Sequence, residues 1–403
     1  MRRVLFVGQD QPLWQEIRAN SPEFSKQWSS EFRQNAREAL ALADDGNFDA
    51  VVADVQLCDM SGVELLDEFM RRQPQAFRLV LSEQGDLQST VRCIGKAHHH
   101  LLKPCDAAMV ADALNQGLGK TAWTPPKAAQ DLIGKLRWVP SPPNVYFQIA
   151  LEMESPAASV ETIGKIIAQD PPTTAKVLQL ANSAVFGLHM QVNEPAEAVA
   201  YLGLEATRTL VLLAHTFSEF DRLPKGGFSV DELWYHSVLV GQLARHIVCL
   251  EEQGSELGEQ AYAAGLLHDL GKVLFAANLP EPFGQALQLS KAGPMSLHIA
   301  ERHFLGASHA EVGACLLGIW NLPAPIVQAV GLHHQPSGLK QKSFGVLTAV
   351  HAADVFARAM APAQSGARLP ELDLIYLGQL GLIERADFWR KQCEEKVAAV
   401  DGV

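Results

Sequence analysis

The sequence lacks the features of a membrane-spanning or disulfide-stabilised protein. No apolar run approaches the roughly 18 residues that a membrane-spanning helix needs. The apolar stretch at the N-terminus ends at Gln9 and Asp10, too early for a signal peptide. The six cysteines form no CxxC pair. These absences predict a reduced, cytoplasmic protein that does not insert into a membrane.

Positive charge is also in short supply. The 33 lysines and arginines are outnumbered by 45 aspartates and glutamates, so the formal net charge is −12 at pH 7. Because a protein that binds nucleic acid needs a basic face, direct nucleic-acid binding is not expected. Apolar residues make up 48% of the chain, which excludes a disordered protein. The length of 403 residues predicts two or three domains.

Residues 1–120 alternate between strand-like and helix-like segments. Short apolar runs, separated by amphipathic segments, occur at 3–7, 48–53 and 78–81. Five strand–helix units with short links predict an α/β domain, in which helices cover both faces of a parallel sheet. A Pro-Pro pair cannot continue a helix, so we expect a Pro-rich linker over 121–130.

The rest of the chain shows helical periodicity and almost no alternating pattern. The segment LPKGG at 223–227 interrupts this periodicity. We therefore predict an all-α domain of two helical lobes, residues 131–225 and 226–403. In the first lobe, Asp170 directly precedes a proline, which is typical of a helix N-cap rather than of a catalytic group.

Three polar side chains of the first domain stand where predicted strands end. Asp54 follows the run FDAVVA, Ser82 follows RLVL, and Lys103 ends the last strand. The carboxyl ends of parallel strands meet at one edge of a sheet. There a carboxylate can accept a phosphoryl group, while a hydroxyl and an ammonium bind its oxygens.

This arrangement resembles a bacterial response-regulator receiver domain over the full length of residues 1–120. The resemblance implies that Asp54 is the phosphoacceptor, with Ser82 and Lys103 in the same pocket and Pro104 after the lysine.

The positions that normally carry two acidic Mg²⁺ ligands after the first receiver strand depart from that pattern. They read Gly8-Gln9 here, with Asp10 just beyond. We therefore expect a weakened Mg²⁺ site that relies on Asp10, and weak or absent phosphorylation of Asp54. The alternative is a degenerate receiver that serves only for docking or dimerisation.

Histidines are concentrated in the second half, where nine of the 14 follow residue 230. The adjacent His268 and Asp269 lie in the apolar run GLLHDLGK, and burying them unpaired would be costly. Metal ligation would satisfy both, and such ligands suit Fe, Mn or Zn. The candidate ligands are His236, His268, Asp269, His309, His333, His334 and Asp354.

The order of these ligands resembles the HD superfamily of metal-dependent phosphohydrolases. The resemblance implies that all seven converge in one pocket, that Asp269 could bridge two ions, and that Lys272 could contact a phosphate oxygen. The alternative is a vestigial site whose histidines only pack and form hydrogen bonds. The remaining histidines of this region are expected on helix surfaces or in the core: His246, His298, His303 and His351.

Further stretches resemble the HDOD domain, a helical module related to HD hydrolases, over nearly all of residues 131–395. They are LRWVPSPP, IIAQDPPTTAKVLQLANSAVFG, AVAYLGLEATRTLVL and WNLPAPIVQAV. HDOD proteins are generally regarded as signalling modules without an established catalytic activity. The resemblance therefore implies intracellular signal transduction of the response-regulator type, with the HDOD domain as a protein-interaction output. The implied partners are other signalling proteins, a sensor histidine kinase and a second copy of the chain.

The alternative function is a metal-dependent phosphodiesterase or phosphohydrolase acting on a cyclic dinucleotide or a nucleotide phosphoester. The related HD-GYP phosphodiesterases, which cleave cyclic di-GMP, carry a Gly-Tyr-Pro motif shortly after the His-His pair. That stretch reads QPSGLKQKSFG here, without the motif. This difference counts against cyclic di-GMP as the substrate.

Overall fold

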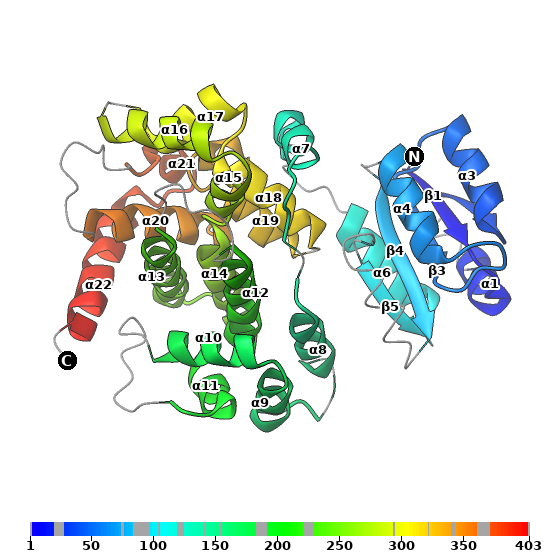
Figure 1. Cartoon of the computed structure of the whole chain (residues 1–403), viewed down its shortest axis with the longest axis horizontal. Coiled ribbons are helices and arrows are strands. Elements are labelled where there is room, and N and C mark those ends of the chain that lie inside the picture. The colour runs from blue at the N-terminus through cyan, green and yellow to red at the C-terminus, as the bar shows by residue number, and fades with distance from the viewer. Residues whose placement is uncertain are drawn as a thin grey trace. The chain divides into compact units, whose positions relative to one another are not determined.

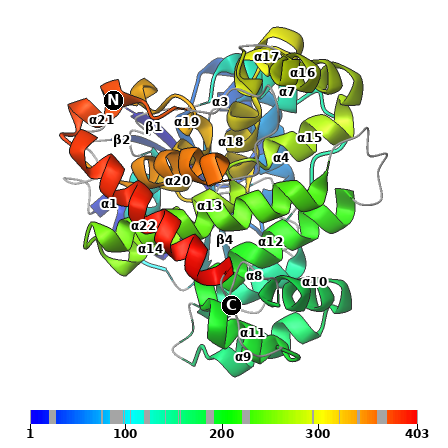
Figure 2. The same cartoon turned by 90° about the vertical axis from the view of Figure 1, so that its left-hand side faces the viewer.

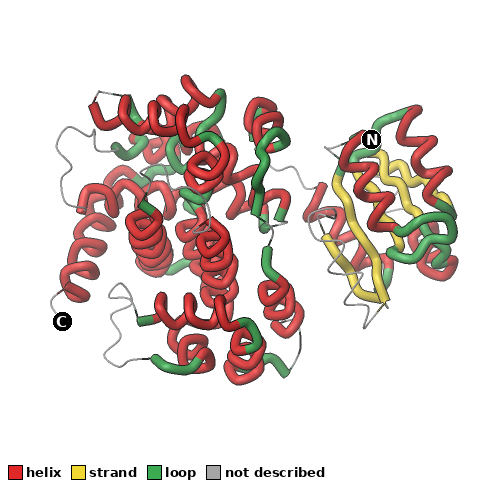
Figure 3. The backbone as a smooth tube through the Cα atoms, viewed as in Figure 1, coloured by secondary structure: helices red, strands yellow, loops and turns green. Residues whose placement is uncertain are grey.

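The structure is a computed structural model. It describes residues 2–19, 28–73, 76–83, 97, 99–103, 105–118, 125–140, 142–153, 155, 157–182, 192–220, 229–292, 295–320, 322–339, 343–360 and 371–401. The chain divides into two compact units, residues 1–121 and residues 122–318 with 322–403. All strands within the described ranges lie in the first unit, and the second is helical (Figure 3).

The first unit is a parallel sheet with helices on both faces. Its strands lie in the order β2-β1-β3-β4-β5, and every neighbouring pair is parallel. The strands are Arg2–Val7 (β1), Trp28–Arg33 (β2), Ala50–Asp54 (β3), Phe77–Glu83 (β4) and His99–Lys103 (β5). The helices are Gln11–Ala19 (α1), Ala36–Asp45 (α3), Gly62–Arg72 (α4) and Ala107–Leu118 (α6). The predicted α/β class is confirmed.

The two faces of this sheet follow from the period of two along each strand. In β1, Val4 and Phe6 pack in one apolar cluster with α1 and α6, while Leu5 and Val7 pack in another with α3 and α4. Strand β3 is buried along its whole length, so Asp54 is held at its carboxyl end by a rigid core.

Strand β2 has no apolar run in the sequence, so the pattern of apolar runs does not predict it. It reads WSSEFR, and only Trp28 is fully buried. The strand lies at the edge of the sheet beside β1. An edge strand is covered less than a central one, so it tolerates polar side chains.

The second unit is all-α, as predicted. Its helices are Lys127–Ile133 (α7), Asn144–Met153 (α8), Val160–Ala168 (α9), Pro171–Ala181 (α10), Pro195–Leu202 (α11), Leu204–Phe220 (α12), Val230–Leu250 (α13), Ser255–Leu267 (α14), Gly271–Asn278 (α15), Pro280–Ala292 (α16), Leu297–Leu305 (α17), His309–Ile319 (α18), Ala324–Leu332 (α19), the 3₁₀ helix Pro336–Gly338 (η2), Val346–Met360 (α20), Leu374–Gln379 (α21) and Ile383–Asp401 (α22). No helix of the described ranges is long and apolar enough to cross a membrane.

Helices α13, α14, α19 and α20 pack against one another at the centre of this unit. In both Figure 1 and Figure 2, α9, α10 and α11 gather at one end of the unit, and α16 and α17 lie at the opposite end. Ser229 caps α13 by accepting a hydrogen bond from the backbone N–H of Glu232. The central helices therefore form a fixed frame for the side chains that they carry.

The segment before α8 forms hydrogen bonds with a residue of the second predicted lobe. The side chain of Asn278, at the end of α15, accepts a hydrogen bond from Trp138 N and donates one to Trp138 O, both at 2.8 Å.

Residues 127–130, at the end of the expected linker, belong to α7. Asp170 accepts a hydrogen bond from Thr173 N at 3.1 Å, the geometry of an N-cap on α10.

Candidate metal centre and receiver pocket

The structure brings the seven predicted ligands of the helical unit together, although His236 and Asp354 are 118 residues apart. They form two groups, and within each group one ligand atom of every residue lies within 4.8 Å of the others. The first ligand group is His236, His268 and Asp354. The second ligand group is Asp269, His309, His333 and His334.

The ends of helices position several of these side chains. His268 is the C-terminal cap of α14, and His333 is the C-terminal cap of α19. Asp269 lies in the turn that leads to α15. A Cβ atom on Gly271, the first residue of α15, would lie 2.0 Å from the carbonyl oxygen of His309. Only glycine lets the His-Asp turn approach α18 this closely.

Backbone carbonyls orient two of the imidazole rings. Nδ1 of His268 donates to Gly265 O at 2.6 Å, and Nδ1 of His333 donates to Val330 O at 2.7 Å. A proton on Nδ1 directs Nε2 of the ring toward the pocket, as in metal-binding histidines. Nε2 of His333 is buried and has no hydrogen-bond partner among the described residues. A divalent ion would satisfy such an atom, so the donor set fits a metal.

Asp269 lies between the two ligand groups. Its Oδ1 atom is 3.0 Å from Nε2 of His309, in the second group. Its Oδ2 atom is 3.3 Å from Nε2 of His268, in the first group. One carboxylate therefore presents one oxygen to each group, which is the arrangement that a bridging ligand needs.

Two cationic side chains also contact the carboxylates. Nζ of Lys272 lies 2.5 Å from Asp269 Oδ2, so the ammonium predicted to contact a phosphate oxygen is bound to a carboxylate. The guanidinium of Arg358 contacts Asp354 Oδ1 at 2.8 Å and Asp269 Oδ2 at 3.2 Å. Arg358 is not among the residues predicted from the sequence. Its position one helical turn after Asp354 is the signal that could have found it.

Glu301 on α17 is a second residue that the sequence analysis missed. It is fully buried, and its Oε2 atom accepts hydrogen bonds from the backbone N–H of His309 at 2.8 Å and from Nδ1 of the same residue at 2.5 Å. A carboxylate behind a ligand imidazole fixes the ring and raises its basicity. A single glutamate in an amphipathic helix carries no sequence signal of this role.

Two other histidines support the second ligand group. The ring of His298 stacks on that of His334 with centroids 4.5 Å apart, so it borders the centre rather than lying elsewhere on the surface or in the core. Nδ1 of His351 donates to the carbonyl oxygen of His333, while Nε2 accepts from Asp373 N. His351 is a buried core residue, and it anchors the end of α19.

Burial and charge set the protonation of the ligands. Desolvation lowers the pKa of His236 to about 4 and holds the pKa of His333 and His334 well below the usual range. Neutral imidazoles of this kind are ready to bind a metal. Desolvation also acts on His268, but the carboxylates of Asp269 and Asp354 together outweigh it and raise the pKa of His268 to about 9.

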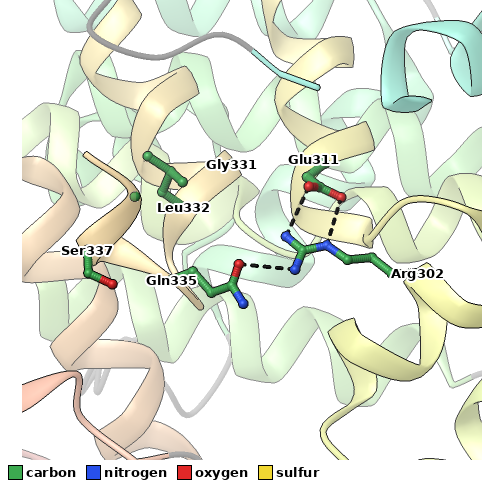
Figure 4. Close-up of a pocket in the computed structure, with 7 residues that line it drawn as sticks. Arg302, Glu311, Gly331, Leu332, Gln335 and Ser337 are labelled. Atoms are coloured by element: carbon green, nitrogen blue, oxygen red, sulfur yellow. Dashed lines mark hydrogen bonds and ion pairs between the residues drawn. The ribbon is translucent and has the colours of Figure 1, made fainter. Parts of the chain in front are cut away.

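A polar pocket with a volume of about 450 Å³ lies beside this centre. Figure 4 shows Arg302 paired with Glu311 and with Gln335, the residue after His334. Arg302 is the one cationic side chain among the lining residues, which are all described, and these protein partners satisfy it. The pocket therefore offers no unpaired positive charge to a phosphate group.

The receiver pocket of the first unit contains the other predicted site residues. Nζ of Lys103 lies 2.8 Å from Asp54 Oδ1 and 2.9 Å from Asp10 Oδ2, and Ser82 lines the same cavity of about 280 Å³. Asp54 and Ser82 are buried. Burial raises the pKa of Asp54, although the hydrogen bond and charge of Lys103 oppose the shift. Pro104 lies outside the described residues.

At positions 8 and 9, where a receiver normally carries two acidic residues, the carboxylate of Asp54 and a backbone N–H occupy the space. A Cβ atom on Gly8 would lie 2.1 Å from Asp54 Oδ2, so the carboxylate of Asp54 leans into the volume that a side chain at position 8 would fill. The backbone N–H of Gln9 donates to the same oxygen at 3.2 Å. Asp10 is the carboxylate that remains beside Asp54, and both carboxylates pair with the ammonium of Lys103.

Known protein families match both units. The model of the response regulator receiver domain matches residues 5–115, and the model of the HDOD domain matches residues 139–336. The chain joins a receiver domain to an HDOD domain, and this architecture is that of a signalling protein of the response-regulator type.

A curated protein matches part of the chain. An uncharacterised protein of Treponema pallidum (strain Nichols) is 27% identical over 213 residues, which cover 52% of this chain and 40% of the relative. The chain therefore spans about two fifths of the length of that curated relative.

Solved structures show the same fold. The HDOD domain protein of unknown function from Geobacter sulfurreducens is 24% identical, with a TM-score of 0.55, over 68% of this chain and 95% of its own. A putative signal transduction protein from Marinobacter aquaeolei VT8 is 18% identical, with a TM-score of 0.51, over 82% of this chain and 78% of its own.

Proposed function

We propose that this chain is a signalling protein that receives input at the receiver pocket and uses the HDOD domain as a protein-interaction output. In this proposal the His/Asp centre binds a divalent ion, Fe, Mn or Zn, for a structural role rather than for catalysis. A sensor histidine kinase or another signalling protein is the proposed source of the input.

The observation that supports a role other than catalysis is the compensation of charge inside the centre. Asp269 and Asp354 are both buried, and uncompensated buried carboxylates would cost several kcal/mol each. Lys272 and Arg358 place two cations on these two carboxylates. The centre is therefore balanced by its own side chains and does not depend on metal for its charge.

The alternative is a metal-dependent phosphodiesterase or phosphohydrolase acting on a cyclic dinucleotide or a nucleotide phosphoester. The buried, unpartnered Nε2 atom of His333 and the shared position of Asp269 favour it. A metal ion bound by these residues would polarise a phosphate ester. Against this reading, Lys272 and Arg302 already pair with carboxylates.

Hydrolysis assays on the full chain loaded with Fe, Mn or Zn decide between the two. The substrates are an activated phosphodiester, cyclic dinucleotides and nucleotide esters. We expect retained metal and no hydrolysis above background. Hydrolysis that His333→Gln abolishes, but that the matched variant His246→Gln on α13 preserves, would establish the enzyme and overturn the structural role.

A further inference from the structure

Arg358 occupies a distinctive place in the first ligand group. Its guanidinium binds one carboxylate on its own helix, α20, and one in the turn before α15. Nε lies 2.8 Å from Asp354 Oδ1, and Nη2 lies 3.2 Å from Asp269 Oδ2. The side chain is 29% exposed, but its charged end lies against two buried carboxylates. A cation held between these oxygens takes the place in which a divalent ion would bind them both.

The imidazoles of the first ligand group face the same two oxygens. Nε2 of His236 is 2.9 Å from Asp354 Oδ1 and 3.8 Å from Asp269 Oδ2. Nε2 of His268 is 3.6 Å and 3.3 Å from the same atoms. The ligands of this group therefore converge on oxygens that already bind an arginine, and a metal ion there would meet a fixed positive charge.

The second ligand group differs on this point. Asp269 Oδ1 faces Nε2 of His309 at 3.0 Å and Nε2 of His333 at 4.0 Å. No lysine or arginine of the described ranges forms an ion pair with this oxygen. On Asp269, Lys272 and Arg358 both bind Oδ2, so Oδ1, which faces His309 and His333, is paired with neither of these cations.

We infer that the Arg358 guanidinium is a built-in cation that holds one of the two metal positions, so that the chain binds a single divalent ion at Asp269, His309, His333 and His334. This inference rests on the metal binding in the proposed function. Arg358 then determines how many ions the centre accepts. A single ion supports the structure but leaves no pair of ions to share a substrate oxygen.

The first experiment counts ions in the full chain. Wild-type protein, Arg358→Met and Arg358→Lys are loaded with Mn²⁺, freed of unbound metal and measured by elemental analysis and electron paramagnetic resonance. We expect one isolated ion in wild type and in Arg358→Lys, which keeps a cation, and a coupled pair of ions in Arg358→Met. Arg385→Met is the matched control. Nη2 of Arg385 lies 2.6 Å from Glu251 Oε1, and neither residue belongs to the two ligand groups. This control variant should bind one ion.

A second experiment does not depend on the folding of the arginine variants. In the otherwise wild-type chain, His333→Gln should lower Mn²⁺ affinity by more than about 100-fold, whereas His236→Gln should lower it by less than about 10-fold. Thermal stabilisation by Mn²⁺ should follow the same order.

The outcomes separate this inference from the proposed metal site. Two ions in wild type, equal losses from His236→Gln and His333→Gln, or a single ion in folded Arg358→Met would overturn the role of Arg358 while leaving the metal site in place. No ion in either wild type or Arg358→Met would overturn both.

Discussion

Neutralising Glu301 tests whether the carboxylate behind His309 supports the metal centre. The variant Glu301→Gln keeps the size of the side chain and one acceptor oxygen but removes the negative charge. In the native chain Glu301 Oε2 accepts both from His309 N and from His309 Nδ1, at 2.8 and 2.5 Å. Both bonds survive in the variant as neutral hydrogen bonds.

The expected losses follow from these two bonds. A hydrogen bond to a charged group is worth about 1.5–3 kcal/mol, against about 0.5–1.5 kcal/mol for a neutral one. Weakening both should lower the free energy of unfolding by about 2–3 kcal/mol. Loss of a charged partner behind a ligand imidazole typically lowers metal affinity by about 10- to 100-fold. We expect both effects in Glu301→Gln.

Urea unfolding and Mn²⁺ titration of the full chain measure the two quantities. Glu311→Gln is the matched control, because Glu311 is a nearby carboxylate that pairs with Arg302 and bonds to no ligand imidazole. It should leave metal affinity nearly unchanged. Wild-type affinity in folded Glu301→Gln, or an equal loss of affinity in Glu311→Gln, would refute the reasoning.

The remaining predictions concern the receiver pocket and the frame of the helical unit. Acetyl phosphate with Mg²⁺ should label Asp54 slowly or not at all, as intact mass will show, and rapid stoichiometric labelling abolished by Asp54→Ala would contradict this. Asp170→Ala should lower the free energy of unfolding in urea by about 1 kcal/mol through loss of the cap on α10, and unchanged stability would contradict the capping role. Asn278→Asp removes two donated hydrogen bonds, one of them to Trp138, and should cost about 2 kcal/mol by the same measurement. A variant as stable as wild type would show that this link between α15 and the segment before α8 is not important.

The periodicity of the sequence was enough to predict both fold classes. Buried strands such as β3 read as apolar runs, and the run before Asp54 places the carboxylate at a strand end. Edge strand β2 was not predicted, because Trp28 is its one buried residue and a single residue forms no apolar run. Central and edge strands thus leave different signals, since only the central ones are covered on both faces and both edges.

The set of ligands could also be predicted from the sequence. An ionisable pair such as His268 and Asp269 in an apolar run must find hydrogen-bond or metal partners when the chain folds. The individual contacts among these side chains could not be predicted from the sequence. Glu301 reaches His309 only when α17 lies against the start of α18, and a lone glutamate on a helix has no pattern of its own.

The sequence by itself determined which side chains of this protein could act as ligands, because residue type and local apolar context decide what must be satisfied on burial. Only the tertiary structure decided how they are shared. Asp269 divides its oxygens between two groups, and Arg358 takes the oxygens of one of them. These choices depend on the packing of helices that are distant in the sequence, and packing sets distances that no local pattern contains.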